Sequence, residues 1–341
     1  MRGRSINRWG ATPEPAELPD PEPGDGEVLV RVEACGVGLT VLNCIRGDLG
    51  DDPDDLPRTP GHELVGTIVA TGPGVPGARV GSRVTAYFYL FCGACPRCLA
   101  GEESLCDALE GFLGVHRDGG YAELAVLPDR NAISLPDGLD PVLSTAIPDA
   151  IATPVHVAGR ARIAPGDRVA VVAAGGGVGV HMVQVARVWG AEVVGLDIDP
   201  AKLAFLRDEL GIAAADSTDF GAVLLPPAWE GRADVVVDLL GTPASLTWSL
   251  EHLATGGRLV VLTTFRDVDF PVSPRRLVFG QAEVLGSRYA SRHEVVQSAR
   301  LVAEGRVRPV IGARADVDGV QDIHDALREG RLLGRGALVW S

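Results

Sequence analysis

Apolar positions in the first 140 residues occur in short runs that Gly and Pro interrupt. Residues 27–34 and 64–70 have the length and the branched apolar side chains that are typical of β-strands. Turn-forming sequences separate such runs, for example at 72–77 and 136–138. Several short strands divided by regular turns predict a compact barrel or sandwich. The polar, Pro-rich residues 13–25 are expected to form an exposed lead-in.

From about residue 150 the pattern changes to apolar runs that alternate with helical spacing. Residues 168–173 are almost continuously apolar and lead into three glycines, and residues 178–189 have the spacing of a helix. Further buried strands are expected at 192–196, 234–239 and 258–263. Strands buried on both faces that alternate with helices predict a doubly wound parallel sheet, so the fold class is α/β. Residues 285–341 return to mixed strand and helix and end in a strand at 336–340.

Composition limits the possible functions of the chain. Its 341 residues, 46% of them apolar and 22% charged, fit a folded protein of two domains. The 31 Lys and Arg against 45 Asp and Glu give a net charge of −14, which argues against a nucleic-acid or membrane-binding surface. No apolar run is long enough to span a membrane, and the first residues lack the apolar core of a secretory signal. We therefore expect a cytoplasmic protein whose partner is a small molecule.

The glycine-rich turn at 174–179 is a candidate dinucleotide site. A dinucleotide needs a strand, a tight turn that lets the backbone approach the pyrophosphate, and a helix whose free N–H groups face it. The candidate residues here are Gly176, Gly177 and Gly179, although Ala174 stands at the position of the first glycine of the usual motif. Asp197 follows 23 residues after Ala174, at the end of the next predicted strand, where its carboxylate can accept both ribose hydroxyls. The same carboxylate would repel a 2′-phosphate and no Arg follows it directly, so NAD(H) is favoured over NADP. The alternative is an ordinary strand–turn–helix with an incidental Asp.

Four cysteines form a cluster with the spacing of a metal site. Cys92, Cys95, Cys98 and Cys106 are separated by two, two and seven residues. Four thiolates on one short excursion can surround a tetrahedral Zn²⁺, and they leave no position for water or substrate. This spacing predicts one structural zinc per chain, with a redox dithiol or an iron–sulfur cluster as the alternative. Cys35 and Cys44 lie apart and are expected to be small buried apolar residues.

In this order, the nucleotide turn and the cysteine cluster resemble the medium-chain dehydrogenase/reductase superfamily, of the zinc-type alcohol dehydrogenase kind. The resemblance covers nearly the whole chain. It rests on residues 32–37 (VEACGV), 60–66 (PGHELVG), 80–84 (VGSRV), 119–123 (GGYAE), 165–169 (PGDRV) and 334–336 (GRG).

The resemblance implies a GroES-like β-rich catalytic domain with a Rossmann NAD-binding domain inserted into it. The catalytic domain would comprise residues 1–148 and 285–341, and the Rossmann domain residues 149–284. By the same resemblance four more residues are expected to contact the cofactor: Thr153, Val178 behind the nicotinamide, Lys202 near the adenosine ribose, and Arg335 at the pyrophosphate. A homodimer or homotetramer is also expected.

The chain departs from this family at the catalytic zinc. The family holds that ion with a cysteine, a histidine and a third thiolate or acid, and the first of these positions is Gly38 here. His62 remains, with Glu63 beside it, and the third position falls on Asp149. These three side chains could hold a zinc through one nitrogen and two oxygens, or they could form a hydrogen-bonded network without metal. In the usual proton relay Thr40 would remain, but Asn43 replaces a titrating histidine and cannot carry a proton.

The missing ligand favours one reaction type over another. Alcohol oxidation and carbonyl reduction place charge on an oxygen bonded to the reacting carbon, where a Lewis acid is most useful. Hydride delivery to the β-carbon of a conjugated carbonyl places the charge on a remote enolate oxygen, for which hydrogen-bond donors suffice. Candidate donors are Thr40, Tyr87 and Tyr89, although both tyrosines could equally serve in packing.

Three functional hypotheses follow. The favoured one is an NAD(H)-dependent oxidoreductase that reduces a conjugated or activated carbonyl without a catalytic zinc. The alternative within enzymes is a zinc-dependent alcohol or polyol dehydrogenase that uses His62, Glu63 and Asp149. The alternative outside enzymes is a nucleotide-binding protein without turnover. Four further histidines, namely His116, His252, His293 and His324, are expected at the surface.

Overall fold

The computed structural model describes residues 1–264 and 268–340, and the remaining residues of the predicted domain ranges lie outside it. Contacts within the chain divide it into two compact units. Unit 1 comprises Met1–Ala152, Ala290–Gly305 and Pro309–Ser341, and unit 2 comprises Thr153–Tyr289 and Arg306–Arg308. The second unit is thus inserted into the first, and the predicted domain limits at residues 148 and 285 fall a few residues from these divisions.

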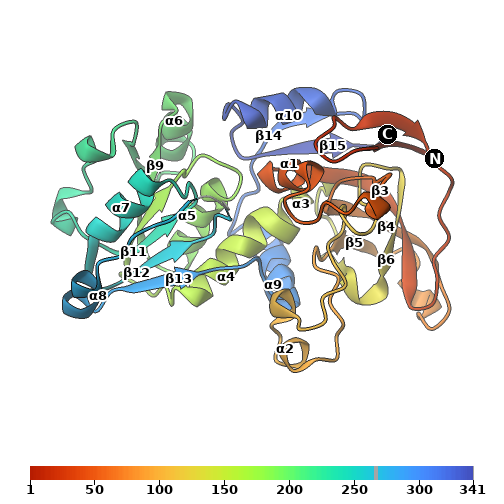
Figure 1. Cartoon of the computed structure of the whole chain (residues 1–341), viewed down its shortest axis with the longest axis horizontal. Coiled ribbons are helices and arrows are strands. Elements are labelled where there is room, and N and C mark those ends of the chain that lie inside the picture. The colour runs from red at the N-terminus through yellow and green to blue at the C-terminus, as the bar shows by residue number, and fades with distance from the viewer. Residues whose placement is uncertain (265–267, 341) are drawn as a thin grey trace. The chain divides into compact units, whose positions relative to one another are not determined.

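Unit 1 is built around a seven-stranded, mainly antiparallel sheet (Figure 1). The strand order is β14-β15-β3-β4-β5-β7, β6 also pairs with β3, and β1 pairs with β2 in a separate small sheet. The strands are β1 (Arg2–Ser5), β2 (Glu14–Glu17), β3 (Glu27–Val37), β4 (Glu63–Thr71), β5 (Arg83–Ala86), β6 (Leu124–Pro128), β7 (Ala132–Ser134), β14 (Ile311–Ala315) and β15 (Arg335–Val339). The helices are α1 (Leu39–Arg46), α2 (Pro96–Leu99), α3 (Pro141–Ser144), α9 (Arg292–Ala303) and α10 (Val320–Arg328).

Strand β3 lies at the centre of this sheet and positions much of the site. Val28, Val30 and Val32 are buried and alternate with more exposed residues, which is the period-two pattern of a strand with one face on the core. The strand pairs with β4 on one side, so that Gly36 lies opposite Glu63, and with the C-terminal strand β15 on the other. Segments from the beginning and the end of the chain therefore meet at β3.

Unit 2 is a six-stranded sheet in which every strand pair is parallel. The strand order is β10-β9-β8-β11-β12-β13, the arrangement of a Rossmann domain. The strands are β8 (Arg168–Val172), β9 (Glu192–Asp197), β10 (Ala213–Asp216), β11 (Ala233–Asp238), β12 (Leu253–Val261) and β13 (Glu283–Gly286). The helices are α5 (Gly179–Val188), α6 (Pro200–Asp208), α7 (Pro243–Glu251) and α8 (Pro274–Gly280), and α4 (Ala152–Arg160) begins at the division between the units.

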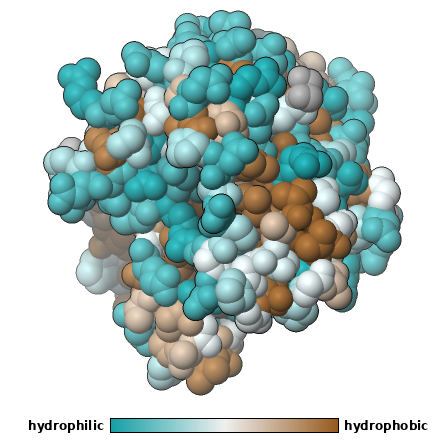
Figure 2. All heavy atoms as spheres, turned by 90° about the vertical axis from the view of Figure 1, so that its right-hand side faces the viewer, coloured by the Kyte–Doolittle hydropathy of each residue, from teal (hydrophilic) through white to brown (hydrophobic). Residues whose placement is uncertain are grey.

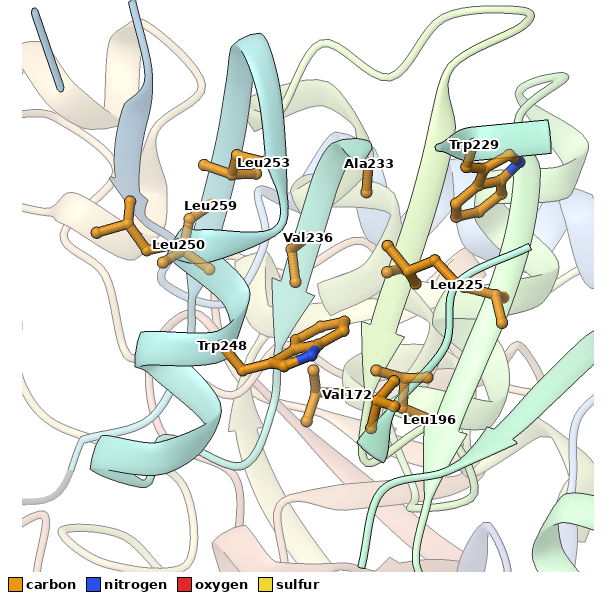
Figure 3. Close-up of a cluster of buried hydrophobic side chains, with 13 residues drawn as sticks. Val172, Leu196, Leu225, Trp229, Ala233, Val236, Trp248, Leu250, Leu253 and Leu259 are labelled. Carbon is orange, nitrogen blue, oxygen red and sulfur yellow. The ribbon is translucent and has the colours of Figure 1, made fainter. Parts of the chain in front are cut away.

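A large part of the core of unit 2 lies between the sheet and helix α7. Figure 3 shows Trp248 pointing from α7 toward Val172 of β8 and Val236 of β11. Trp229 is also buried, and its indole N–H donates to the Glu192 carboxylate at 2.9 Å. These apolar side chains fix the parallel strands whose carboxyl ends carry the nucleotide turn.

The face in Figure 2 is largely hydrophilic, with a smaller hydrophobic area. Within residues 1–264 and 268–340, no helix is both long and apolar enough to cross a membrane.

One of the predicted surface histidines is buried. His324 lies with Val320 and Ile323 on the inward face of α10, and its Nε2 is 2.9 Å from the Tyr121 hydroxyl oxygen. The surface prediction for His324 is wrong because the helical spacing of these three residues places the imidazole on the packed face.

Candidate active site

The turn after β8 brings the strand and the start of α5 into close contact. Ala173 has a φ of 59°, in the left-handed region, so the chain turns sharply at the end of the strand. A Cβ on Gly179 would lie 2.2 Å from the carbonyl oxygen of Ala173, so this position requires glycine. Gly176, Gly177 and Val178 connect these two positions. The turn therefore lies at the N-terminus of a ten-residue helix, whose free N–H groups favour an anion.

Asp197 ends the neighbouring strand β9 and is held beside this turn. Its Oδ2 accepts the N–H of Gly175 at 2.8 Å, and its Oδ1 accepts those of Ile198 and Asp199 at 2.9 and 3.2 Å. Strands β9 and β11 flank β8, so the turn lies at the carboxyl end of the strand where the sheet order reverses. The carboxylate is thus fixed at the edge where a doubly wound sheet binds nucleotides.

The other predicted cofactor residues fall in two different units. A Cβ on Gly175 would lie 2.5 Å from the Cβ of Lys202, so this buried lysine packs directly against the glycine turn. Thr153 is buried at the start of unit 2. Arg335 belongs to unit 1, where its guanidinium contacts two carboxylates. The roles of these three residues toward the cofactor remain predictions.

The four cysteines converge on one point, as the spacing predicted. Neighbouring sulfur atoms in the cluster of Cys92, Cys95, Cys98 and Cys106 are 3.5 to 3.9 Å apart. Four thiolates at about 2.3 Å from a tetrahedral zinc are about 3.8 Å from one another, so the cluster fits this ion without rearrangement. All four positions would be filled by sulfur, which identifies the site as structural.

Backbone N–H groups already favour thiolates in this cluster. The sulfur of Cys92 accepts from the N–H groups of Ala94 and Cys95 at 3.4 and 3.3 Å, and that of Cys95 accepts from Cys98 at 3.5 Å. The hydrogen bond from the Cys98 backbone lowers the pKa of Cys95 to about 6. The lowered pKa favours the thiolate of Cys95, the form that binds zinc, whereas burial and the neighbouring thiols raise the pKa of Cys98 to about 12.

A second cluster, which we call the buried charge cluster, consists of His62, Glu63, Asp149 and Arg335. All four side chains are buried in unit 1, with exposed fractions of 1%, 0%, 8% and 3%. His62 immediately precedes β4, Glu63 begins it, Asp149 lies in a π-helical turn at Ile147–Ile151, and Arg335 begins β15. The structure thus brings together the three predicted metal-site residues and adds a cation to them.

The three predicted ligands have the spacing of metal donors. Nε2 of His62 lies 3.5 Å from Oε1 of Glu63 and 3.5 Å from Oδ2 of Asp149. Donor atoms of all three residues lie within 4.8 Å of one another. By spacing alone, this set could hold a divalent ion.

The guanidinium of Arg335 binds the same two oxygens. Its Nη2 is 2.9 Å from Oε1 of Glu63 and 2.8 Å from Oδ2 of Asp149. Burial alone would lower the pKa of Arg335, but the charges of Glu63 and Asp149 outweigh it and raise the pKa. A divalent ion on these oxygens would lie directly beside a second cation, so a catalytic metal does not fit while Arg335 holds this position.

The side chains around His62 favour its protonated form. Burial lowers the pKa of His62, but its contacts with Asp149, Cys44 and Glu63 outweigh this effect, and the pKa lies well above its ordinary value. The cluster thus places two basic side chains, His62 and Arg335, against two acidic ones, Glu63 and Asp149.

The three hydroxyl groups predicted to donate to a substrate differ in their burial and in their contacts within the protein. The Tyr87 hydroxyl donates to the carbonyl oxygen of Ala290 at 2.6 Å, in keeping with a packing role. Tyr89 is buried among aromatic rings, with its ring 4.9 Å from that of Phe112. Thr40 is half-buried in the first turn of α1, and Asn43 accepts from Arg46 at 2.6 Å. Thr40 therefore remains the most accessible of the three predicted donors.

Comparison with known proteins identifies the family. The model of the alcohol dehydrogenase GroES-like domain matches residues 24–137, and that of the zinc-binding dehydrogenase matches residues 177–304. The chain is 31% identical to an alcohol dehydrogenase of Geobacillus stearothermophilus over 98% of each protein. It is 29% identical to an acryloyl-coenzyme A reductase of Metallosphaera sedula over 96% of each. A cobalt- and zinc-bound thermostable alcohol dehydrogenase from Pyrobaculum aerophilum has a similar structure, with a TM-score of 0.89, 31% identity and coverage of 100% of this chain and 99% of that one.

The chain belongs to the zinc-type alcohol dehydrogenase family of the medium-chain dehydrogenase/reductase superfamily. The predicted α/β fold, with a GroES-like domain and a Rossmann sheet, is confirmed. So is the prediction of an oxidoreductase, with NAD(H) and structural zinc as its cofactors. Sequence reasoning missed the position of Arg335 against Glu63 and Asp149.

Proposed function

We propose that this enzyme uses NADH to reduce a conjugated or activated carbonyl compound without a catalytic zinc. The observation that carries the proposal is the ion pair of Arg335 with Glu63 and Asp149, because it neutralises the donors a catalytic metal would need. The acryloyl-coenzyme A reductases among its relatives support this reaction type, since their name describes the reduction of a conjugated thioester.

The proposed reaction requires only one hydrogen-bond donor from the protein at the carbonyl oxygen. A bound NADH would supply the hydride, which forms a C–H bond at the β-carbon while the C=C electrons move toward the carbonyl oxygen. The α-carbon then takes a proton from water, and a saturated carbonyl compound and hydroxide are the balance of this step. A hydroxyl that donates to the developing enolate oxygen is sufficient, and Thr40 at the start of α1 is the donor we propose.

A second candidate function is zinc-dependent alcohol oxidation. Among the residues that the structure describes, neither carboxylate oxygen of Glu63 accepts a hydrogen bond of normal geometry, as expected of a metal ligand. The relatives named alcohol dehydrogenase favour this candidate. It requires Arg335 to leave Glu63 and Asp149, which would open the three donors to an ion.

A substrate panel distinguishes the two functions. NADH oxidation is measured with enones, enoyl thioesters, quinones, ketones and aldehydes, and NAD⁺ reduction with alcohols, before and after brief exposure to a chelator. We expect turnover of enones or enoyl thioesters that the chelator leaves unchanged, with the saturated product identified by mass spectrometry. Turnover confined to alcohols and their carbonyl products, lost with the chelator and restored by Zn²⁺, would contradict the proposal.

The role of Thr40 can be tested by two substitutions. T40V keeps the shape of the side chain and removes the hydroxyl, so we expect kcat to fall roughly 100-fold. T40S keeps the hydroxyl and is the matched control, with kcat close to that of the wild type. Equal kcat values for T40V and T40S would remove Thr40 from the mechanism.

The preference for NAD(H) is proposed to depend on Asp197. In D197N the charge that attracts the ribose hydroxyls and repels a 2′-phosphate is lost, while an acceptor oxygen remains for the turn. We expect NADH binding to weaken roughly 10- to 100-fold and NADPH binding to change far less. D199N is the control, because Asp199 caps α6 through its bond to the N–H of Ala201. Equal weakening of both nucleotides in D197N would oppose this assignment.

We also propose a cytoplasmic homodimer or homotetramer. All six cysteines are free, as expected in a reducing compartment. Within the described residues the outer edge of β13 is unpaired, and Val278 and Phe279 on nearby α8 are 71% and 72% exposed. An open strand edge beside exposed apolar residues favours contact with a second copy. Light scattering tests this: we expect an oligomer that V278E/F279E dissociates, and a monomeric wild type would contradict it.

A further inference from the structure

Residue 38 is glycine because a neighbouring side chain fills the space beside it, and not because of its backbone conformation. Gly38 has φ −129° and ψ 179°, an extended conformation that any residue adopts. A Cβ built there would lie 1.8 Å from Nη1, 2.4 Å from Cζ and 3.0 Å from Nε of Arg335. The three nearest atoms all belong to one guanidinium, so the arginine head fills the space that a side chain at residue 38 would need.

Arg335 cannot give way at low cost. Its side chain is buried, and Nη2 is held by the carboxylates of Glu63 and Asp149 at 2.9 and 2.8 Å. Moving the guanidinium away from Gly38 would break these contacts and leave two carboxylates without their buried cation. A Cβ at residue 38 would therefore clash with a guanidinium that is held in place by two carboxylates. The clash could not be relieved by a small movement, as it could at the end of a mobile side chain.

A second glycine serves the same cluster. A Cβ on Gly36, near the end of β3, would lie 2.2 Å from Oε2 of Glu63. Gly36 and Gly38, which caps the next helix, therefore both leave space that the cluster occupies. Gly36 makes room for the carboxylate and Gly38 for the guanidinium that binds it. Both gaps are filled by members of the buried charge cluster.

We propose that Arg335 is the resident cation of the His62, Glu63 and Asp149 pocket, and that Gly38 is the residue that admits it. Together the two residues exclude a divalent metal from a set of donors that otherwise has the spacing to bind one. This inference deepens the metal-free reaction proposed above and rests on that proposal for its catalytic meaning, but its test does not use turnover.

A double-mutant cycle tests the coupling between the two residues. G38A adds a Cβ against the guanidinium, and we expect it to lower Tm by about 10 °C in the wild type. In R335A the opposing group is gone, so the same substitution is expected to change Tm by less than about 2 °C. If R335A does not fold, the cost of G38A is measured in the R335K background instead. Lysine keeps the positive charge but lacks the planar guanidinium that meets the Cβ.

Zinc content tests the exclusion of metal. Each variant is purified with excess Zn²⁺, dialysed, and analysed by mass spectrometry for zinc per chain. We expect one zinc in the wild type and in R335K, which keeps the cation, and two in R335A. R46A is the matched control with one zinc, because Arg46 pairs with Asp48 at the surface.

One zinc in R335A, two zincs in the wild type, or an equal cost of G38A in every background would overturn this inference. Failure of the substrate panel would instead overturn the proposed reaction and leave these measurements unaffected.

Discussion

Two clusters in unit 1 have the spacing of metal ligands, and they differ in what neutralises them. In the cysteine cluster, sulfur atoms lie 3.5 to 3.9 Å from one another and also accept from backbone N–H groups. In the buried charge cluster, two carboxylates and an imidazole have similar spacing, but a guanidinium is already bound to both carboxylates. The number and spacing of donors are therefore not sufficient to define a metal site. We propose that the charge of the neighbouring side chain determines whether the donors bind an ion.

The largest effect is expected when one of the four thiolates of the cysteine cluster is removed. C95S replaces a sulfur that zinc would bind, so the chain is expected to lose its zinc and to become largely insoluble. C44A is the control, because Cys44 is buried away from the cysteine cluster, and it is expected to keep one zinc per chain. Zinc content and soluble yield are measured on both, and a soluble C95S that retains its zinc would show that the two clusters do not differ as described.

Removing a carboxylate from the buried charge cluster is expected to lower stability without changing the zinc content. D149N removes one of the two carboxylates that bind the buried Arg335 guanidinium, which we expect to lower the free energy of unfolding by roughly 3 kcal/mol. D48N, at an exposed pair with Arg46, is expected to cost less than about 1 kcal/mol. Denaturant unfolding and zinc analysis measure both quantities. A D149N variant that loses a zinc would assign a metal to the buried charge cluster.

A smaller effect separates two buried histidines by pH. Burial lowers the pKa of His324 to about 4, whereas the pKa of His62 lies well above its ordinary value. The unfolded chain binds a proton at His324 below about pH 6.5 and the folded chain does so only below about pH 4, so stability is lost as the pH falls through this window.

We expect this loss to amount to roughly 2–3 kcal/mol between pH 6.5 and 4. It is measured as the difference in unfolding free energy between the wild type and H324Q, which can keep the contact with the Tyr121 hydroxyl. A difference that does not change with pH would mean that His324 is not the group responsible.

Local features of the fold and the site could be predicted from the sequence. The cysteine cluster depends on four residues in one short loop, so their spacing was enough. The nucleotide turn and Asp197 follow from consecutive strands whose carboxyl ends meet at the same edge. In both places the residues that meet come from one loop or from consecutive strands of one sheet.

The buried charge cluster could not be predicted in this way. Gly38 and Arg335 come from the two ends of the chain and meet only because β15 pairs with β3. The sequence identified Gly38 as a missing ligand, and the signal that could have led further was the glycine itself, which leaves space that a long buried side chain can fill. For His324, the signal of burial is its helical spacing with Val320 and Ile323, which places the three side chains on one face of α10.

Anomalous diffraction at the zinc edge, from crystals of the wild type, locates each metal ion and so shows whether one occupies the buried charge cluster. We expect one strong peak per chain, among the sulfur atoms of Cys92, Cys95, Cys98 and Cys106. A second peak of similar height between His62 and Asp149, with the Arg335 guanidinium displaced from both carboxylates, would contradict it.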